Sequence, residues 1–166
     1  MAANSLKPEF PPLLEVGLHE RTVTQLRELC VNGFVDRAVR REPIMSGLDA
    51  MVKKLAEGGI IGKLWVDGSF LTQKSEPDDV DLLLHVTASF VEKCDQKVRQ
   101  LLDWFRAEQQ EAYACHTFMW IEFEKEDDPD YWIGEYTRAY WLKQYGFARF
   151  NAVKGIAVVK LPDGAA

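Results

Sequence analysis

A dense apolar run from Val80 to Val86 directly follows two aspartates, and it constrains the fold more than any other part of the chain. A strand with one face in water alternates apolar and polar residues, whereas this run predicts a strand in the interior of a sheet. Such a strand needs helices packed against its sheet. Residues 63–66, which end at Asp67-Gly68-Ser69, predict a second, shorter strand.

Helical spacing and capping residues predict helices around these two strands. Helices are expected at 22–33, 43–59, 89–110 and 128–146, and strands at 63–66, 80–86, 116–123 and 155–161. This order predicts a single α/β or α+β domain over residues 1–166, with one small mixed sheet and flanking helices. Residues 1–20, which contain several prolines, are expected to form an extended lead.

Charge and composition exclude several classes of protein. The 20 Lys and Arg against 26 Asp and Glu give a net charge of −6, which argues against a broad surface that binds DNA or RNA. No apolar run approaches the ~20 residues that span a bilayer, so no membrane association is expected. Three widely spaced cysteines favour neither a disulfide framework nor a zinc site. We therefore expect a protein of the cytoplasm.

Two aspartates and a Gly-Ser turn are the candidates for chemistry. Asp79 and Asp81, at positions i and i+2 of a strand, lie on one face about 6–7 Å apart along the backbone. Carboxylates in that arrangement converge on hard cations such as Mg²⁺, which also takes phosphate oxygens as ligands. Gly68 lets the backbone approach a phosphate closely, while the Ser69 hydroxyl and exposed amides donate hydrogen bonds to it.

Each of these patterns also has an ordinary structural interpretation. An Asp-x-Asp motif occurs at solvated strand ends, and Gly-Ser is a common turn. Asp67 and Asp78 are expected to supply turn hydrogen bonds, and Lys74 fits an exposed loop charge as well as a phosphate ligand. What favours function is the order of the two motifs and their spacing between two predicted strands.

The chain resembles the DNA polymerase β-type nucleotidyltransferase superfamily, in which an apolar residue and Gly-Ser precede Asp-apolar-Asp-apolar on the next strand. Val66, Gly68-Ser69 and Asp79-Val80-Asp81-Leu82 fill this pattern, with Asp67 inserted before the glycine. The sequence 65–72, Lys74 and Pro77 in the spacer, Pro11-Pro12, His19 and 154–156 are similar to a family of short bacterial nucleotidyltransferase-like proteins. This similarity extends over nearly the whole chain and implies a nucleotidyltransferase-type fold.

The resemblance also implies a reaction. A nucleoside monophosphate would move from an NTP, with ATP favoured, to a hydroxyl group, and two Mg²⁺ ions, or Mn²⁺ as a substitute, would be held by Asp79 and Asp81. Superfamily members use a third carboxylate on a neighbouring strand in an apolar setting, which Glu122 matches, with Glu124 as the alternative. Gly68, Ser69 and Lys74 would then contact the triphosphate.

Two functions remain open at this point. The first is a metal-dependent nucleotidyltransferase whose acceptor is a protein, an RNA or a small molecule, as in minimal superfamily members of toxin–antitoxin and phage-defence systems. The second is a catalytically degenerate nucleotidyltransferase fold that serves as a nucleotide-binding or antitoxin-like partner module. Because the chain lacks the C-terminal helical domain of larger relatives, a homodimer or a partner chain is expected to complete the substrate site. The aromatic helix at 130–145 is expected to border the nucleotide or to contact that second chain, unless its rings are core.

Overall fold

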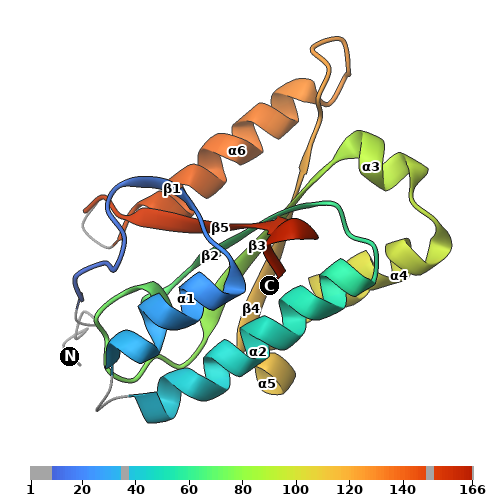
Figure 1. The fold of residues 1–166 in the computed structure, drawn as a ribbon. Coiled ribbons are helices and arrows are strands. Elements are labelled where there is room, and N and C mark those ends of the chain that lie inside the picture. Colours follow the sequence, from blue (N-terminus) through green and yellow to red (C-terminus); the bar gives the residue numbers. More distant parts are fainter. Residues whose placement is uncertain (1–8, 35–37, 149–151, 166) are drawn as a thin grey trace, which may run out of the picture.

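Five strands form one mixed sheet in the order β1-β5-β2-β3-β4 in the computed structural model, which describes residues 9–34, 38–148 and 152–165 (Figure 1). The strands are β1 (Gly17–Glu20), β2 (Gly62–Asp67), β3 (Val80–Thr87), β4 (Cys115–Glu122) and β5 (Gly155–Leu161). β2 runs antiparallel to β3 and β5, whereas β1–β5 and β3–β4 are parallel pairs. The mixed sheet and its helices confirm the predicted α+β fold class.

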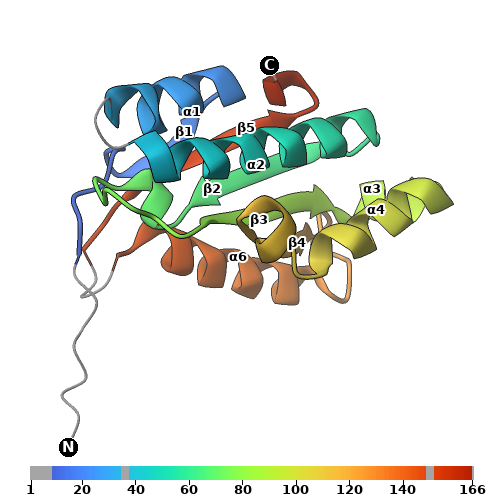
Figure 2. The same ribbon diagram turned by 90° about the horizontal axis from the view of Figure 1, so that it is seen from below.

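The helices cover the two faces of the sheet unequally. Figure 2 shows α6 (Tyr131–Gly146) alone on one face, with α1 (Val23–Cys30) and α2 (Ala38–Glu57) on the opposite face. The remaining helices are α3 (Ala88–Lys93), α4 (Gln96–Arg106) and α5 (Gln110–Tyr113). The larger apolar core lies on the α1–α2 side, and a smaller one, built around Trp65, Trp120 and Tyr145, lies under α6. None of the helices in the described ranges is long and apolar enough to cross a membrane.

The local sequence explains most helix boundaries and two differences from prediction. The helix expected at 89–110 is interrupted, because the Asp95 side chain accepts a hydrogen bond from the Val98 amide and so begins α4 as a new helix. The N-cap of α3 is Thr87, which accepts from the Phe90 amide. The helix expected from residue 89 therefore begins one residue earlier, at Ala88.

Helix α2 begins at Ala38, five residues before the predicted start at Pro43. Proline ends or kinks a helix in its interior but is tolerated near the N-terminus. Here the turn that precedes Pro43 carries Arg41, whose buried side chain is held by hydrogen bonds to several backbone carbonyls. These tertiary contacts extend the helix beyond the point that the proline indicated.

Part of the predicted extended lead joins the sheet. β1 pairs in parallel with β5, and the segment before it runs beside the loop that follows β2. The Leu13 amide donates to Leu71 O at 2.8 Å, and the Gln73 amide donates to Pro11 O at 2.9 Å. Residues 9–12 are thereby fixed next to the Gly68-Ser69 turn.

Candidate functional site

Three aspartates meet where β2 ends and β3 begins. The antiparallel register sets Asp67, the last residue of β2, opposite Asp81. Asp79 precedes β3, and the fully buried Val80 points into the core between the two aspartates. Asp81, on the opposite face of β3 from Val80, therefore lies on the side of the sheet that α6 covers, whereas Asp79 precedes the strand and hydrogen-bonds to Gln110 of α5.

Gly68 is required by the approach of Asp81 to the β2 turn. Its φ of +88° lies in the region that L side chains rarely adopt. A Cβ atom at this position would lie 2.5 Å from Asp81 Oδ2. The predicted turn is thus in direct contact with Asp81, and Ser69 follows as the first residue of a short 3₁₀ helix, Ser69–Leu71.

Asp67 and Lys154 form a buried ion pair at the centre of the cluster. Lys154 Nζ lies 2.7 Å from Asp67 Oδ2, and their side chains are only 11% and 5% exposed. Burial raises the pKa of Asp67 to about 7, and Asp81 raises it too, although Lys154 and the Gly68 amide act in the opposite direction. Asp67 thus accepts a hydrogen bond from the Gly68 amide of the turn, as expected, and in addition forms a buried ion pair with Lys154 that its turn position did not indicate. Both residues belong to the site.

Neighbouring side chains hold the other two aspartates. His116 is the register partner of Asp81 on β4, and its Nδ1 lies 3.3 Å from Asp81 Oδ1. Gln110 donates to Asp79 Oδ2 at 2.5 Å. Burial raises the pKa of Asp81, and the charge of Asp79 raises it further, while His116 and Lys154 lower it. The site therefore brings three carboxyl groups together with one lysine and one histidine.

Glu122 does not join this cluster, contrary to prediction. β4 does lie beside β3, but their parallel register pairs His116 with Asp81 and Glu122 with Thr87. Six residues of strand separate the two positions, which is about 20 Å. Glu122 instead contacts His85 Nε2 at 2.8 Å. Glu124, the alternative, follows the end of β4 and lies farther still from Asp81.

Lys74 also lies apart from the turn that it was expected to assist. Its ammonium group pairs with Asp78 at 3.2 Å, and the residue is absent from the cavity lining described next. Of the three predicted phosphate contacts, the structure brings only Gly68 and Ser69 to the acidic cluster.

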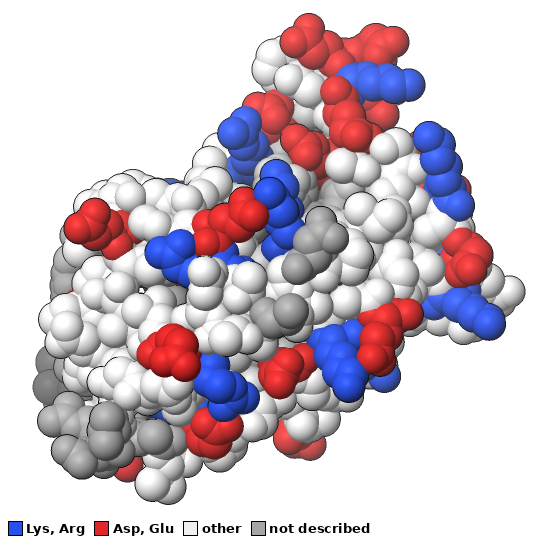
Figure 3. All heavy atoms as spheres, viewed as in Figure 1, with Lys and Arg blue, Asp and Glu red and all other residues white. Residues whose placement is uncertain are grey.

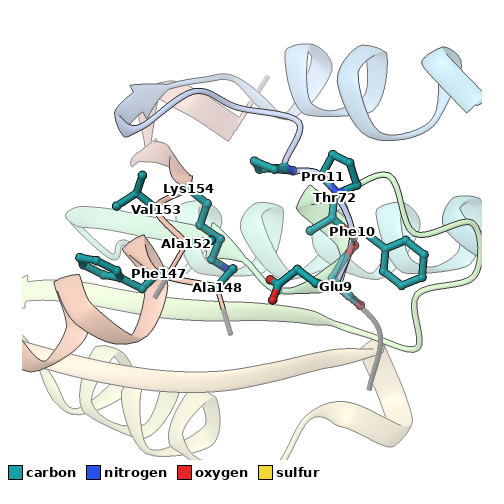
Figure 4. Close-up of a pocket in the computed structure, with 12 residues that line it drawn as sticks. Glu9, Phe10, Pro11, Thr72, Phe147, Ala148, Ala152, Val153 and Lys154 are labelled. Carbon is teal, nitrogen blue, oxygen red and sulfur yellow. Dashed lines mark hydrogen bonds between the residues drawn. The ribbon is translucent and has the colours of Figure 1, made fainter. Parts of the chain in front are cut away.

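A cavity of about 540 Å³ opens beside the Gly68-Ser69 turn (Figure 4). Its lining residues are Glu9, Phe10, Pro11, Pro12, Gly68, Ser69, Thr72, Phe147, Ala148, Ala152, Val153 and Lys154. Phe10 and Phe147 lie on opposite sides of it, and Lys154 extends between these walls. Apolar walls with a few polar groups are typical of small-molecule sites. The expected aromatic helix contributes no lining residue, although Phe147 follows it directly.

Arg41 holds the loop that follows the Gly68-Ser69 turn, a role that the sequence analysis did not identify. Its side chain is fully buried. It donates to the carbonyls of Cys30, Phe70, Thr72 and Lys74 at 2.6–3.0 Å. Three of these carbonyls belong to the loop after Ser69, so Arg41 fixes that loop. A signal existed, because Arg41 shares a helical face with the buried Met45 and Leu48.

The donor set is partly suited to Mg²⁺. Within the described ranges, no group of three or more His, Cys, Asp or Glu is already arranged to hold a metal ion. Yet Asp67 Oδ1 and the Tyr145 hydroxyl are buried without a hydrogen-bond partner in the part of the chain described. Burial, followed by the charges of Asp81 and Asp67, raises the pKa of Tyr145. Carboxylate oxygens are ligands that Mg²⁺ prefers, so Asp79 and Asp81 suit the ion in their chemistry, although the described residues do not form a preassembled site for it.

Comparison with known proteins gives one match. Residues 8–160 match DUF6932, which is described as a family of unknown function. The chain belongs to this family. No curated protein and no solved structure matches the chain. The DUF6932 match spans every strand of the sheet except the last residue of β5, so the acidic cluster and the turn lie inside the family region.

Proposed function

We propose that this DUF6932 protein is a Mg²⁺-dependent nucleotidyltransferase that binds an NTP, with ATP favoured, at the acidic cluster. One observation carries the proposal: Asp81, with the charge of Asp79 acting on it, lies beside a Gly-Ser turn that lines a 540 Å³ cavity. A triphosphate brings negative charge of its own, so it binds next to such carboxylates when a divalent cation lies between them.

Each part of the site has a role in this reaction. Asp79 and Asp81 would hold Mg²⁺, which when bound neutralises phosphate charge and lowers the pKa of an acceptor hydroxyl. Gly68 and Ser69 donate hydrogen bonds to the phosphates, and Lys154 adds positive charge. The acceptor oxygen attacks the α-phosphorus, the bond to pyrophosphate breaks, and the hydroxyl proton leaves to solvent. The walls formed by Phe10 and Phe147 surround the base and exclude water.

A second candidate is a nucleotide-binding module without transfer activity. It is favoured by the position of Glu122, because no third carboxylate of β4 reaches the cluster and His116 stands opposite Asp81 instead. Both candidates use the same nucleotide site, and a transfer assay separates them. As partners, we propose an NTP and a protein or RNA acceptor. We also propose a cytoplasmic location, because that is where an NTP-dependent enzyme finds its substrate.

The test is incubation of the protein with Mg²⁺ and each NTP labelled at the α-phosphate, with cell protein and RNA as acceptors. Intact-mass analysis and pyrophosphate release report transfer. We expect label incorporation that disappears in the double variant Asp79→Asn/Asp81→Asn. Glu122→Gln is the matched control, since it removes a carboxylate at the far end of the same strand pair.

Three outcomes are informative. Transfer by the wild type and by Glu122→Gln alone supports the enzyme. Mg²⁺-dependent NTP binding without transfer supports the binding module. Absence of NTP binding at millimolar nucleotide overturns both.

A further inference from the structure

Helix α6 carries an aromatic stripe, Trp132, Ile133, Tyr136 and Tyr140, that faces away from the sheet. These side chains are 75%, 60%, 76% and 47% exposed. Trp132, Tyr136 and Tyr140 repeat every four residues and so lie along one side of the helix for about 12 Å. The alternative that the rings of this helix are core holds for Trp141 and Tyr145, through which α6 packs on the sheet, but not for the rings of the aromatic stripe. A contiguous exposed apolar stripe is typical of an interaction site.

The charges at the two ends of the stripe are opposite. Before α6, the segment 124–130 contains five acidic residues and one lysine, and Figure 3 shows acidic side chains gathered at this projecting part of the molecule. Near the other end, Lys143 is exposed and lies on the same side of α6 as Trp132 and Tyr136. The helix dipole favours acids at the N-terminus and bases at the C-terminus, which explains the charges but not the exposed rings.

We propose that a second copy of this chain covers the aromatic stripe, with the two α6 helices packed antiparallel about a two-fold axis near Tyr136. Helical spacing then sets Trp132 against Tyr140 of the second copy, and Tyr136 against its own equivalent. The antiparallel direction brings the acidic segment 124–130 of each copy to Lys143 of the other. A parallel pair brings acid to acid, so the charge pattern is self-complementary only in the antiparallel arrangement.

The size of the stripe sets the strength of the contact. Four side chains with these exposed fractions bury on the order of 500 Å² from each copy. The total of about 1,000 Å² falls below the roughly 1,200–2,000 Å² that stable specific interfaces typically bury, in the range of weak, transient contacts. The dimer is therefore expected to dissociate on dilution. This inference is independent of the proposed nucleotidyl transfer, since no residue of the aromatic stripe lines the cavity.

Sedimentation velocity over a concentration series tests the dimer. The wild type is expected to shift from monomer to dimer as concentration rises, whereas Tyr136→Glu stays monomeric because two carboxylates meet at the two-fold axis. Val39→Glu is the matched control: it places the same acid at another exposed apolar helix position, 86% exposed, on α2. Its dimerisation is expected to equal that of the wild type.

A charge exchange tests the antiparallel direction. Lys143→Glu alone and Asp127→Lys alone are each expected to weaken dimerisation, since like charges then meet at both ends. An equimolar mixture of the two variants restores it, because each contact in the mixed dimer again joins opposite charges. A monomeric wild type at all concentrations, a dimer unaffected by Tyr136→Glu, or a mixture no tighter than its components overturns the proposal. Circular dichroism of every variant identifies loss of fold.

Discussion

The sheet face under α6 carries a histidine–carboxylate pair at each end, and the two ends differ in charge balance. At one end His116 contacts Asp81, and at the other His85 contacts Glu122, on the same two strands. Asp81 has two further aspartates nearby, and the turn beside it opens into the 540 Å³ cavity. His85 stacks on Trp120 with ring centroids 3.9 Å apart and is 10% exposed. The two histidine–carboxylate pairs are therefore expected to differ in cation binding, because only Asp81 has two further carboxyl groups beside it.

The pKa shifts at the two ends show the same contrast. Burial raises the pKa of Asp67 and of Asp81, so that end disfavours the charged carboxylates. Burial lowers the pKa of His85, Glu122 opposes that effect, and Lys63 and Arg138 add to it. A divalent cation would stabilise the charged form of Asp67 and Asp81, whereas His85 and Glu122 already stabilise each other. This difference is why we assign function to the Asp81 end.

The largest expected effect concerns Arg41, which supports the acidic end and has no counterpart described at the other. Arg41→Met leaves four backbone carbonyls without their donor, and each buried unsatisfied group costs about 1–3 kcal/mol. We expect a loss of about 3 kcal/mol or more in the free energy of unfolding, measured with urea. Arg40→Met is the matched control. Its exposed side chain makes only a 3.8 Å ion pair with Asp78, so a loss above ~1 kcal/mol there argues against a special role for Arg41.

The second prediction uses the pKa of about 7 at Asp67. Between pH 4 and 7 the unfolded chain has released this proton while the folded chain retains it, so stability falls as pH rises and levels off above 7. With EDTA present, we expect the free energy of unfolding of the wild type to fall by about 2 kcal/mol from pH 5 to 7, relative to that of Asp67→Asn. Parallel stability–pH curves for the two proteins contradict the assignment.

Gly68→Ala tests the close approach of the turn to Asp81. A non-glycine residue at this positive φ costs about 1–2 kcal/mol, and the added Cβ displaces the Asp81 carboxylate. We expect weaker Mg²⁺-ATP binding together with that modest loss of stability. Gly33→Ala serves as the control, because its nearest neighbour to the new Cβ is 3.7 Å away and its φ is not positive. Unchanged nucleotide affinity in Gly68→Ala removes the turn from the site.

The smallest effect is expected at the other end, with the opposite sign. Because the pKa of His85 is lowered in the folded chain, the unfolded chain binds a proton at this residue at higher pH than the folded chain does. The free energy of unfolding therefore falls below about pH 6.5. His85→Gln removes this dependence, and the difference is smaller than at Asp67 because Glu122 opposes the effect of burial. Thermal unfolding between pH 5 and 8 measures it. If His85→Gln still loses stability at acidic pH as the wild type does, another group binds the proton.

Local patterns in the sequence predicted what lies within one element, but not how distant elements align. The apolar run predicted β3 and so placed Asp81 opposite the buried Val80, and the Gly-Ser turn lies beside Asp81. The register of β4 against β3 decides that His116, not Glu122, meets Asp81, and no local pattern sets a parallel register. Arg41 and Lys154 acquire their roles from partners 29–33 and 87 residues away. The helical face that Arg41 shares with Met45 and Leu48 indicated burial, but only the tertiary structure shows which groups Arg41 and Lys154 bind.

Calorimetric titration of ATP at fixed Mg²⁺ into the wild type, Asp81→Asn and Glu122→Gln tests directly whether the nucleotide binds at the Asp81 end. Both substitutions neutralise a carboxylate paired with a histidine on the same two strands. We expect Asp81→Asn to lower ATP affinity by about tenfold or more and Glu122→Gln to leave it unchanged. Equal losses in both variants, or a loss in Glu122→Gln alone, contradict the assignment of nucleotide binding to the Asp81 end.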